Sequence, residues 1–192
     1  RPGASTRRPI PSDILKVIQD RCQSTDDEMR WLVAMISDTG MRLAEAAGLS
    51  KADVHLDTAI PHINIRPHPW RRLKTSGSQR KVPLVGCSLW AAKQALAASS
   101  SHYLFPKYCN NRGCNSNSAS AALNKWLKQL TGPEYVLHSL RHSIRDRLRA
   151  VGCPSDMIDQ IGGWSTSKVG EGYGDGYTLD LLNQNLTAAV CV

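Results

Sequence analysis

Apolar residues recur at intervals of three and four along most of this chain, a spacing typical of helices with one buried face. Ser12 is a suitable N-cap for a first helix that carries Leu15 and Ile18. The same pattern predicts further helices over 27–38, 42–47, 88–98, 118–130, 137–151, 155–162 and 178–189. Helices therefore make up most of the predicted structure.

The segment from His55 to Leu84 has a different pattern. Isoleucines at 60, 63 and 65 favour one strand and residues 80–84 favour another, with Gly77 and several serines between them. The sequence predicts a mainly α fold with a small antiparallel β-sheet or hairpin, which is an α+β class. Residues 1–11 contain three prolines and three arginines and are typical of a flexible linker, so we expect one domain over 12–192.

The composition is that of a globular protein with a basic surface. The 192 residues are 41% apolar and 21% charged, and no run approaches the roughly 18 apolar residues of a membrane helix. Lysine and arginine number 24 against 16 acids, a net charge of +8. This excess favours a polyanionic partner, either nucleic acid or an anionic membrane surface.

Six cysteines are spread along the chain, and only Cys109 and Cys114 are close together. No second pair completes a four-ligand zinc site, so we expect no metal. The sequence predicts six free thiols in a reducing, intracellular compartment, with a local disulfide or metal at Cys109 and Cys114 as the alternative.

The predicted helix over 137–151 has two contrasting faces. Its apolar stripe consists of Leu137, Leu140, Ile144, Leu148 and Val151. The other side gathers His138, Arg141, His142, Arg145 and Arg149. Asp146 is the only acid there, whereas a solvated helix face usually mixes the two signs. A phosphate-facing surface is the sharper interpretation, and an ordinary basic face is the alternative.

A second basic segment lies between the two predicted strands. Its cations are Arg66, Arg71, Arg72, Lys74, Arg80 and Lys81, with no acid between them. Trp70 and two prolines are interleaved with these charges. Such a hairpin suits a nucleic-acid groove, and the alternative is an edge strand that its charges protect from aggregation.

Five short motifs in one order resemble those of the tyrosine recombinases, the phage-integrase family. The segment 39–49, with Arg42 and Glu45, resembles the first arginine box. Lys74 followed by Val-Pro-Leu at 82–84 is similar to the hairpin lysine and the next strand of that family. His138 and Arg141 match the His-x-x-Arg box.

The last two motifs lie towards the C-terminus. Ile-Gly-Gly-Trp-Ser at 161–165 resembles the later box, in which most members have histidine where this chain has Trp164. Tyr173 follows nine residues later, at the spacing of the family's nucleophile. Tyr177 is a second tyrosine in the same glycine-rich stretch, and its spacing of thirteen makes it the weaker candidate.

This resemblance implies a DNA strand-transferase that uses a 3′-phosphotyrosine intermediate and needs no metal, nucleotide or other cofactor. Residues 12–192 would then be its catalytic domain, and 1–11 would lead from a missing N-terminal DNA-binding region. The expected partners are double-stranded DNA and other recombinase protomers in a synaptic complex. We expect no membrane partner and a monomer for this chain alone.

The resemblance also assigns roles to the matched residues. Arg42 and Arg141 would clamp the phosphate, His138 would act as general base or proton shuttle, and Lys74 would protonate the leaving oxygen. Trp164 would hold a phosphate oxygen or pack the site, and Tyr173 would be the nucleophile. Glu45 would orient Arg42 or a neighbouring basic group. Further DNA contacts are expected from Arg71, Arg72, Arg80, Lys81, His142 and Arg145.

Each role has a simpler alternative. Arg42 could only pair with Glu45, Lys74 could be a plain phosphate contact, and Trp164 or Tyr173 could only fill space. For the whole chain, the alternatives are an inactive DNA-binding module and a type IB topoisomerase-like enzyme, with membrane binding more distant. The helix over 178–189 could dock on a neighbouring subunit or fold back on its own core.

Overall fold

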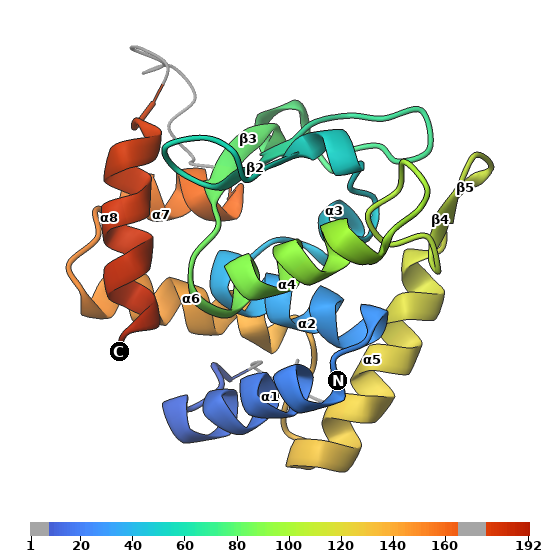
Figure 1. The fold of residues 1–192 in the computed structure, drawn as a ribbon. Helices are drawn as coiled ribbons and strands as arrows, with labels where there is room; N and C mark the ends of the chain where they lie inside the picture. Colours follow the sequence, from blue (N-terminus) through green and yellow to red (C-terminus); the bar gives the residue numbers. More distant parts are fainter. Residues whose placement is uncertain (1–7, 165–175) are drawn as a thin grey trace, which may run out of the picture.

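The computed structural model describes residues 8–164 and 176–192, and it is built mainly of helices (Figure 1). These are α1 (Ser12–Thr25), α2 (Glu28–Thr39), α3 (Leu43–Ala47), α4 (Gly86–Ala98), α5 (Ser116–Thr131), α6 (Ser139–Ala150), α7 (Ser155–Gly162) and α8 (Leu179–Val190). Two short 3-10 turns are η1 (Lys51–Asp53) and η2 (Ser76–Ser78). The predicted α+β class is confirmed, because every predicted helix forms near its expected place.

A small antiparallel sheet lies between α3 and α4 in the sequence. It has the order β1 (Val54–His55), β2 (His62–Ile65) and β3 (Arg80–Pro83). Ile63 of β2 pairs with Val54 on one side and Val82 on the other, and all three side chains are buried. The predicted hairpin is therefore β2 and β3, and β1 was not foreseen.

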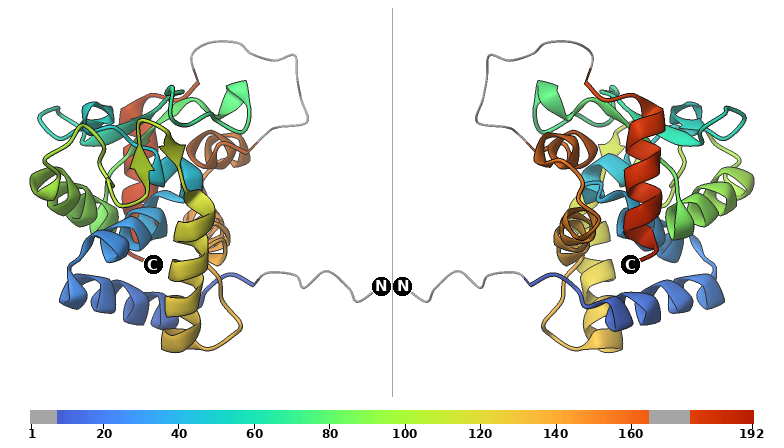
Figure 2. Two further views of the ribbon diagram at one scale, coloured as in Figure 1. Left: turned by 90° about the vertical axis from the view of Figure 1, so that its right-hand side faces the viewer. Right: turned by 90° about the vertical axis from the view of Figure 1, so that its left-hand side faces the viewer.

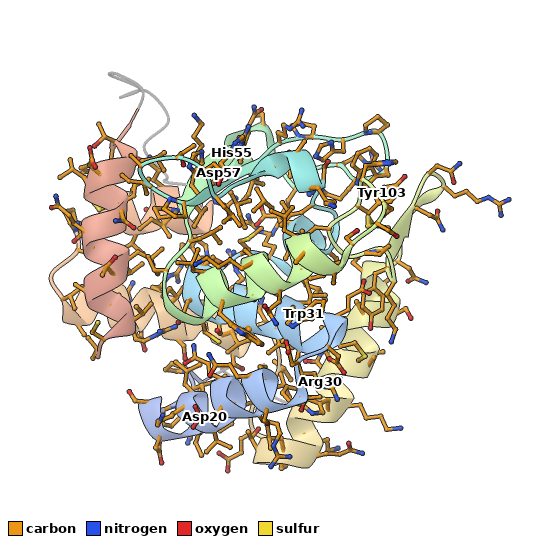
Figure 3. The ribbon with its side chains drawn as sticks, in the orientation of Figure 1. Asp20, Arg30, Trp31, His55, Asp57 and Tyr103 are labelled. Carbon is orange, nitrogen blue, oxygen red and sulfur yellow. A yellow bond between two sulfur atoms is a disulfide. The ribbon has the colours of Figure 1, made fainter. Side chains whose placement is uncertain are left out.

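Helix α2 is the centre of the core. Figure 1 shows it between α1 and α4, and α6 also packs against it. Its residues from Leu32 to Thr39 are all buried, as expected of a helix covered on every side. At the other end, Figure 3 shows Arg30 where α2 approaches α5, and its guanidinium lies 4.9 Å from the ring centre of Trp126. No helix within 8–164 or 176–192 is both long and apolar enough to cross a membrane.

The end of α2 sets the path of the next segment. Gly40 caps the helix with φ +70°, and its N–H donates to the carbonyl of Ile36. A Cβ at Gly40 would lie 2.3 Å from Ile144 Cγ2 of α6. Only glycine fits there, and this close approach brings the start of α3 next to α6.

Both ends of the described chain pack onto the core. Ile10 is buried and exchanges two hydrogen bonds with Ser143 Oγ, at 2.8 Å and 3.0 Å, so the packed region begins within the predicted linker. Helix α8 lies on the opposite flank from α5 (Figure 2) and contacts α6, β3 and α2. Its buried residues Leu182 and Leu186 show that α8 folds back on its own chain.

One cysteine prediction is wrong. Cys109 and Cys114 face each other in a two-stranded hairpin of β4 (Cys109–Asn110) and β5 (Gly113–Cys114), and they form a disulfide. The five-residue spacing of the two cysteines was the signal in the sequence. The hairpin register explains the bond, because it places the paired residues Cys109 and Cys114 opposite one another. The other cysteines, at 22, 87, 153 and 191, are free thiols.

Candidate active site

Arg42 and Glu45 meet at the start of α3. Arg42 is the N-cap residue, and its backbone N–H donates to Glu45 Oε1 at 2.8 Å. Its side chain also reaches the same carboxylate, with Arg42 Nη1 3.2 Å from Glu45 Oε2. The simple pairing expected from their spacing is therefore present, but it is only part of a larger cluster.

Arg80 is the stronger partner of Glu45. Arg80 Nη1 donates to Oε2 at 2.8 Å and Nη2 donates to Oε1 at 2.9 Å, which is a bidentate ion pair between two buried side chains. Burial alone would raise the pKa of the Glu45 carboxyl, but hydrogen bonds from Arg80 and the charges of Arg80 and Arg42 lower it below its ordinary value. Glu45 is therefore an anion shared by two arginines.

The burial of Arg80 corrects its predicted role as a DNA contact. Strand β3 alternates, so Arg80 points into the protein while Lys81 points outward. Sequence pattern could not show which of these two neighbours faced inward, because both carry the same charge.

Three successive carbonyl groups at the end of α7 each accept a hydrogen bond from a different arginine. The pairs are Ile161 with Arg80 Nε at 2.9 Å, Gly162 with Arg141 Nη1 at 3.1 Å, and Gly163 with Arg42 Nη2 at 2.8 Å. A helix C-terminus carries partial negative charge, so it is a favourable place to hold cations. Residues far apart in the sequence thus converge on one helix end, which the sequence analysis did not foresee.

The two glycines of this helix end are required by close contacts. A Cβ at Gly163, where φ is +67°, would lie 2.5 Å from Arg80 Nη1. A Cβ at Gly162 would lie 1.8 Å from Trp164 Cζ3. The pair lets the arginines and the indole approach the backbone, and the Gly-Gly dipeptide was the signal that could have indicated this approach.

Arg141 lies at the centre of the cluster. Its side chain is buried, and Nη1 also donates to the carbonyl of Gly40 at 2.6 Å. Burial, and next the charge of Arg42, lower the pKa of the Arg141 guanidinium to about 9. The positive charge of Arg141 is therefore held in an environment that an added anion would make more favourable.

Trp164 stacks against two arginines. The guanidinium carbons of Arg141 and Arg145 lie 4.6 Å and 4.0 Å from the centre of its ring. These distances are typical of cation–π contacts. The geometry supports the packing interpretation of Trp164 and brings Arg145 beside the buried cluster.

His138 stands at the edge of this cluster. It is exposed, it precedes the first residue of α6, and its ring lies edge-on to His142 at 5.1 Å. His138 and Arg141 line a cavity of about 270 Å³ together with Met41, Leu43 and Asn124. The predicted His-x-x-Arg pair therefore opens onto one hollow.

The segment between β2 and β3 contains exposed and buried cations. Arg72 and Lys74 are exposed, as is Lys81 of β3. Arg71 is instead buried, and it donates to the carbonyls of Glu45 at 3.0 Å and Arg66 at 2.8 Å. Its prediction as a DNA contact is corrected on this ground, because its guanidinium fastens the loop to α3.

Tyr173 lies outside the described residues, whereas Tyr177 is fixed on α7. Gln160 Oε1 accepts from the Tyr177 amide at 2.9 Å, and Gln160 Nε2 donates to the Tyr177 carbonyl at 3.1 Å. The Tyr177 hydroxyl donates to Asp156 Oδ1 at 2.8 Å, and this hydrogen bond raises the pKa of Tyr177. Sequence reasoning missed Gln160 and Asp156, because nothing local marks them as anchors for a later segment.

Comparison with known proteins adds a family and a set of similar structures. The model of the phage integrase family matches residues 11–175. No curated protein sequence matches the chain.

Several solved recombinase structures share the fold. XerA recombinase is 22% identical with a TM-score of 0.64, covering 97% of this chain and 61% of its own. XerH site-specific recombinase, in a post-cleavage complex with its difH substrate, is 18% identical with a TM-score of 0.61, covering 95% and 49%. The Tn1549 transposon integrase, in complex with circular intermediate DNA, is 16% identical with a TM-score of 0.65, covering 85% and 61%. This chain thus spans between about half and three fifths of these structures.

Proposed function

This chain belongs to the phage integrase family, and on that premise we propose that it is the catalytic domain of a recombinase that cuts and rejoins DNA. The observation that carries the proposal is the convergence of Arg42 and Arg141 on Gly163 and Gly162 at the end of α7, ten and eleven residues before Tyr173. We call Arg42 and Arg141 the phosphate clamp. The catalytic domain would extend over 12–192 with Ile10 packed against it, and the residues before Ile10 would link it to a further DNA-binding region.

The charge of the cluster supports an anionic substrate. Arg42 and Arg80 pair with Glu45, and the charges of Arg141 and Glu45 also interact. Three arginines therefore surround this one buried carboxylate. Buried positive charge without a matching anion is unfavourable, and a phosphodiester would supply the missing negative charge with oxygen atoms suited to guanidinium groups. The lowered pKa of Arg141 has the same cause.

The proposed reaction is an in-line substitution at phosphorus. The Tyr173 oxygen forms a bond to phosphorus while the bond to the 5′-oxygen breaks, which leaves a 3′-phosphotyrosine and a free 5′-hydroxyl. His138 accepts the phenol proton, and Lys74 gives a proton to the leaving oxygen. The clamp neutralises the charge that develops on the non-bridging oxygens. A 5′-hydroxyl then attacks the phosphotyrosine, so the strand is rejoined without an external energy source.

Exposed and half-buried cations give the proposed DNA surface. Lys74 and Arg72 precede η2, Lys81 points outward from β3, and Arg145 flanks Trp164. We propose that these side chains and His142 contact duplex DNA around the clamp. Double-stranded DNA and further protomers in a synaptic complex are the proposed partners.

A covalent adduct is the direct test. The chain would be incubated with a pool of nicked duplexes of random sequence, and protein–DNA adducts would be separated on a denaturing gel. Nicked DNA traps the adduct, because cleavage near the nick releases a short fragment that carries the 5′-hydroxyl. Once this fragment diffuses away, it cannot attack the phosphotyrosine and reverse the reaction. We expect Tyr173→Phe to abolish the adduct and Tyr177→Phe to retain it, because the Tyr177 hydroxyl is bonded to Asp156.

The outcomes separate the candidate functions. Binding without an adduct would favour an inactive DNA-binding module. Loss of the adduct in Tyr177→Phe alone would show that Tyr177, and not Tyr173, is the nucleophile. If the protein forms an adduct and relaxes supercoiled DNA but never joins two duplexes, the topoisomerase-like alternative would be favoured.

A further inference from the structure

Arg80 connects three parts of the site. Its guanidinium donates to Glu45 in α3, to the Ile161 carbonyl of α7 at 2.9 Å, and to the Ser78 carbonyl of η2 at 2.6 Å. The side chain is only 4% exposed, so it is enclosed by the protein and is not available to DNA. Its importance must therefore come from what it does to neighbouring groups.

Arg80 shares both oxygens of Glu45 with Arg42. Oε1 accepts from the Arg42 amide and from Arg80 Nη2, and Oε2 accepts from Arg42 Nη1 and from Arg80 Nη1. The Arg80 contacts to these oxygens, at 2.8 Å and 2.9 Å, are shorter than the 3.2 Å side-chain contact of Arg42. The carboxylate is therefore already compensated by Arg80.

We propose that Arg80 is a positioning residue that keeps the charge of Arg42 available for a DNA phosphate by neutralising Glu45 in its place. The proposal rests on the function proposed above. Without Arg80, the only buried acid of the cluster in the described structure would pair one-to-one with Arg42. Arg42 would then turn from a phosphate ligand into the partner of Glu45.

The structure offers a matched control. Arg147 of α6 is also buried and forms a buried ion pair, with its Nη1 2.9 Å from Asp38 Oδ1 of α2. It also donates to the carbonyl of Ser37. Replacing Arg147 removes the same kind of interaction from the core, away from Arg42 and Glu45.

The first experiment measures DNA binding and does not depend on cleavage. The affinity for a random-sequence duplex is measured at several salt concentrations, with folding checked by circular dichroism. We expect Arg80→Met to reduce the slope of log K against log salt by about one, although Arg80 is buried, because Arg42 no longer neutralises a phosphate. Arg147→Met should keep the wild-type slope.

Two further variants separate positioning from general damage. Arg80→Lys keeps a cation beside Glu45 and should retain the wild-type slope. Adding Glu45→Gln to Arg80→Met removes the competing anion and should restore the slope. An unchanged slope in Arg80→Met, or a reduced slope that Glu45→Gln does not restore, would overturn the proposal.

The second experiment uses adduct formation. Arg80→Met should slow the reaction of an ordinary phosphodiester by about 100-fold, and should slow a neutral methylphosphonate at the same position far less, because that group needs less cationic stabilisation. Equal slowing on both substrates would contradict the positioning role. Absence of an adduct in the wild-type protein would instead refute the proposed function, and the salt slopes would still decide the role of Arg80.

Discussion

Arg147 and Arg80 each form a buried ion pair, and the two pairs differ in the surroundings of the carboxylate. Asp38 accepts from Arg147 at 2.9 Å, and it also accepts from the Cys87 amide at 2.8 Å and the Gln19 side chain at 3.0 Å. Both of these further donors are neutral. The Asp38 pair is therefore balanced, with one cation for one anion.

Glu45 is surrounded differently, because it lies between two arginines with Arg141 close by. A balanced pair links helices and leaves no charge for a ligand. An unbalanced cluster retains positive charge that a ligand can neutralise. The contrast teaches that a buried arginine indicates a binding site only when the positive charges around it outnumber the negative ones.

The largest expected effect is on adduct formation, and it distinguishes the Glu45 cluster from the Asp38–Arg147 ion pair. Arg141→Met should reduce adduct formation by about 1,000-fold, since it removes half of the phosphate clamp. Arg147→Met should reduce the free energy of unfolding by about 3–5 kcal/mol, because it leaves the Asp38 carboxylate buried without its cation. Its adduct rate per folded molecule should stay near that of the wild type.

Urea unfolding and single-turnover adduct formation would measure these two quantities on the same preparations. The comparison breaks if Arg147→Met loses the adduct as completely as Arg141→Met while it remains folded.

The next effect concerns Lys74, an exposed cation that we propose belongs to the site. Lys74→Ala should slow cleavage of ordinary DNA by about 100-fold, because the 5′-oxygen leaves poorly without a proton. DNA with sulfur in place of that oxygen should react at nearly the wild-type rate, since a thiolate needs no acid. Equal slowing of both substrates, measured by adduct formation, would make Lys74 a phosphate contact only.

The sequence predicted the helices and the order of the motifs because both are local patterns. Periodicity predicted α6, and the short boxes singled out Arg42, His138 and Arg141 as candidates. The assembly of the cluster is not local, because Arg80 and Ile161 are 81 residues apart and Arg42 and Gly163 are 121 apart.

The wrong predictions have the same origin. Arg71 and Arg80 were assigned to DNA because charge alone was considered, yet strand alternation and carbonyl partners determine that both are buried. The disulfide between Cys109 and Cys114 was only the alternative prediction, because no strand was predicted there and the facing register of its hairpin was not visible.

A smaller effect follows from the carboxylate at the centre of the cluster. The pKa of Glu45 is lowered in the folded protein. Its ionised form therefore stabilises the fold at pH values above the ordinary pKa of 4.5. That contribution is lost as the pH falls through the lowered folded pKa. We therefore expect Glu45→Gln to be less stable than the wild type at pH 7.

The difference in the free energy of unfolding should shrink below about pH 4.5, as the wild-type carboxyl becomes protonated. Urea titrations at a series of pH values would measure it. A difference that stays constant down to pH 2 would show that the ion pairs of Glu45 add nothing to stability.

The smallest expected effect compares two adjacent arginines. Arg72 is exposed, whereas Arg71 is buried with its guanidinium on the Glu45 and Arg66 carbonyls. Arg72→Met should lower the slope of log K against log salt for duplex DNA by about one and leave the unfolding temperature unchanged, because a phosphate contact is lost. Arg71→Met should lower the unfolding temperature, because it leaves two carbonyl groups near α3 without their donor. It should leave the slope unchanged, because the surface charge that contacts DNA is kept. Salt titrations of DNA affinity and thermal unfolding on the same two variants measure both effects. If Arg71→Met changes the slope and Arg72→Met does not, then the loop between β2 and β3 rearranges when DNA binds, and the division between buried and exposed arginines does not hold in the complex.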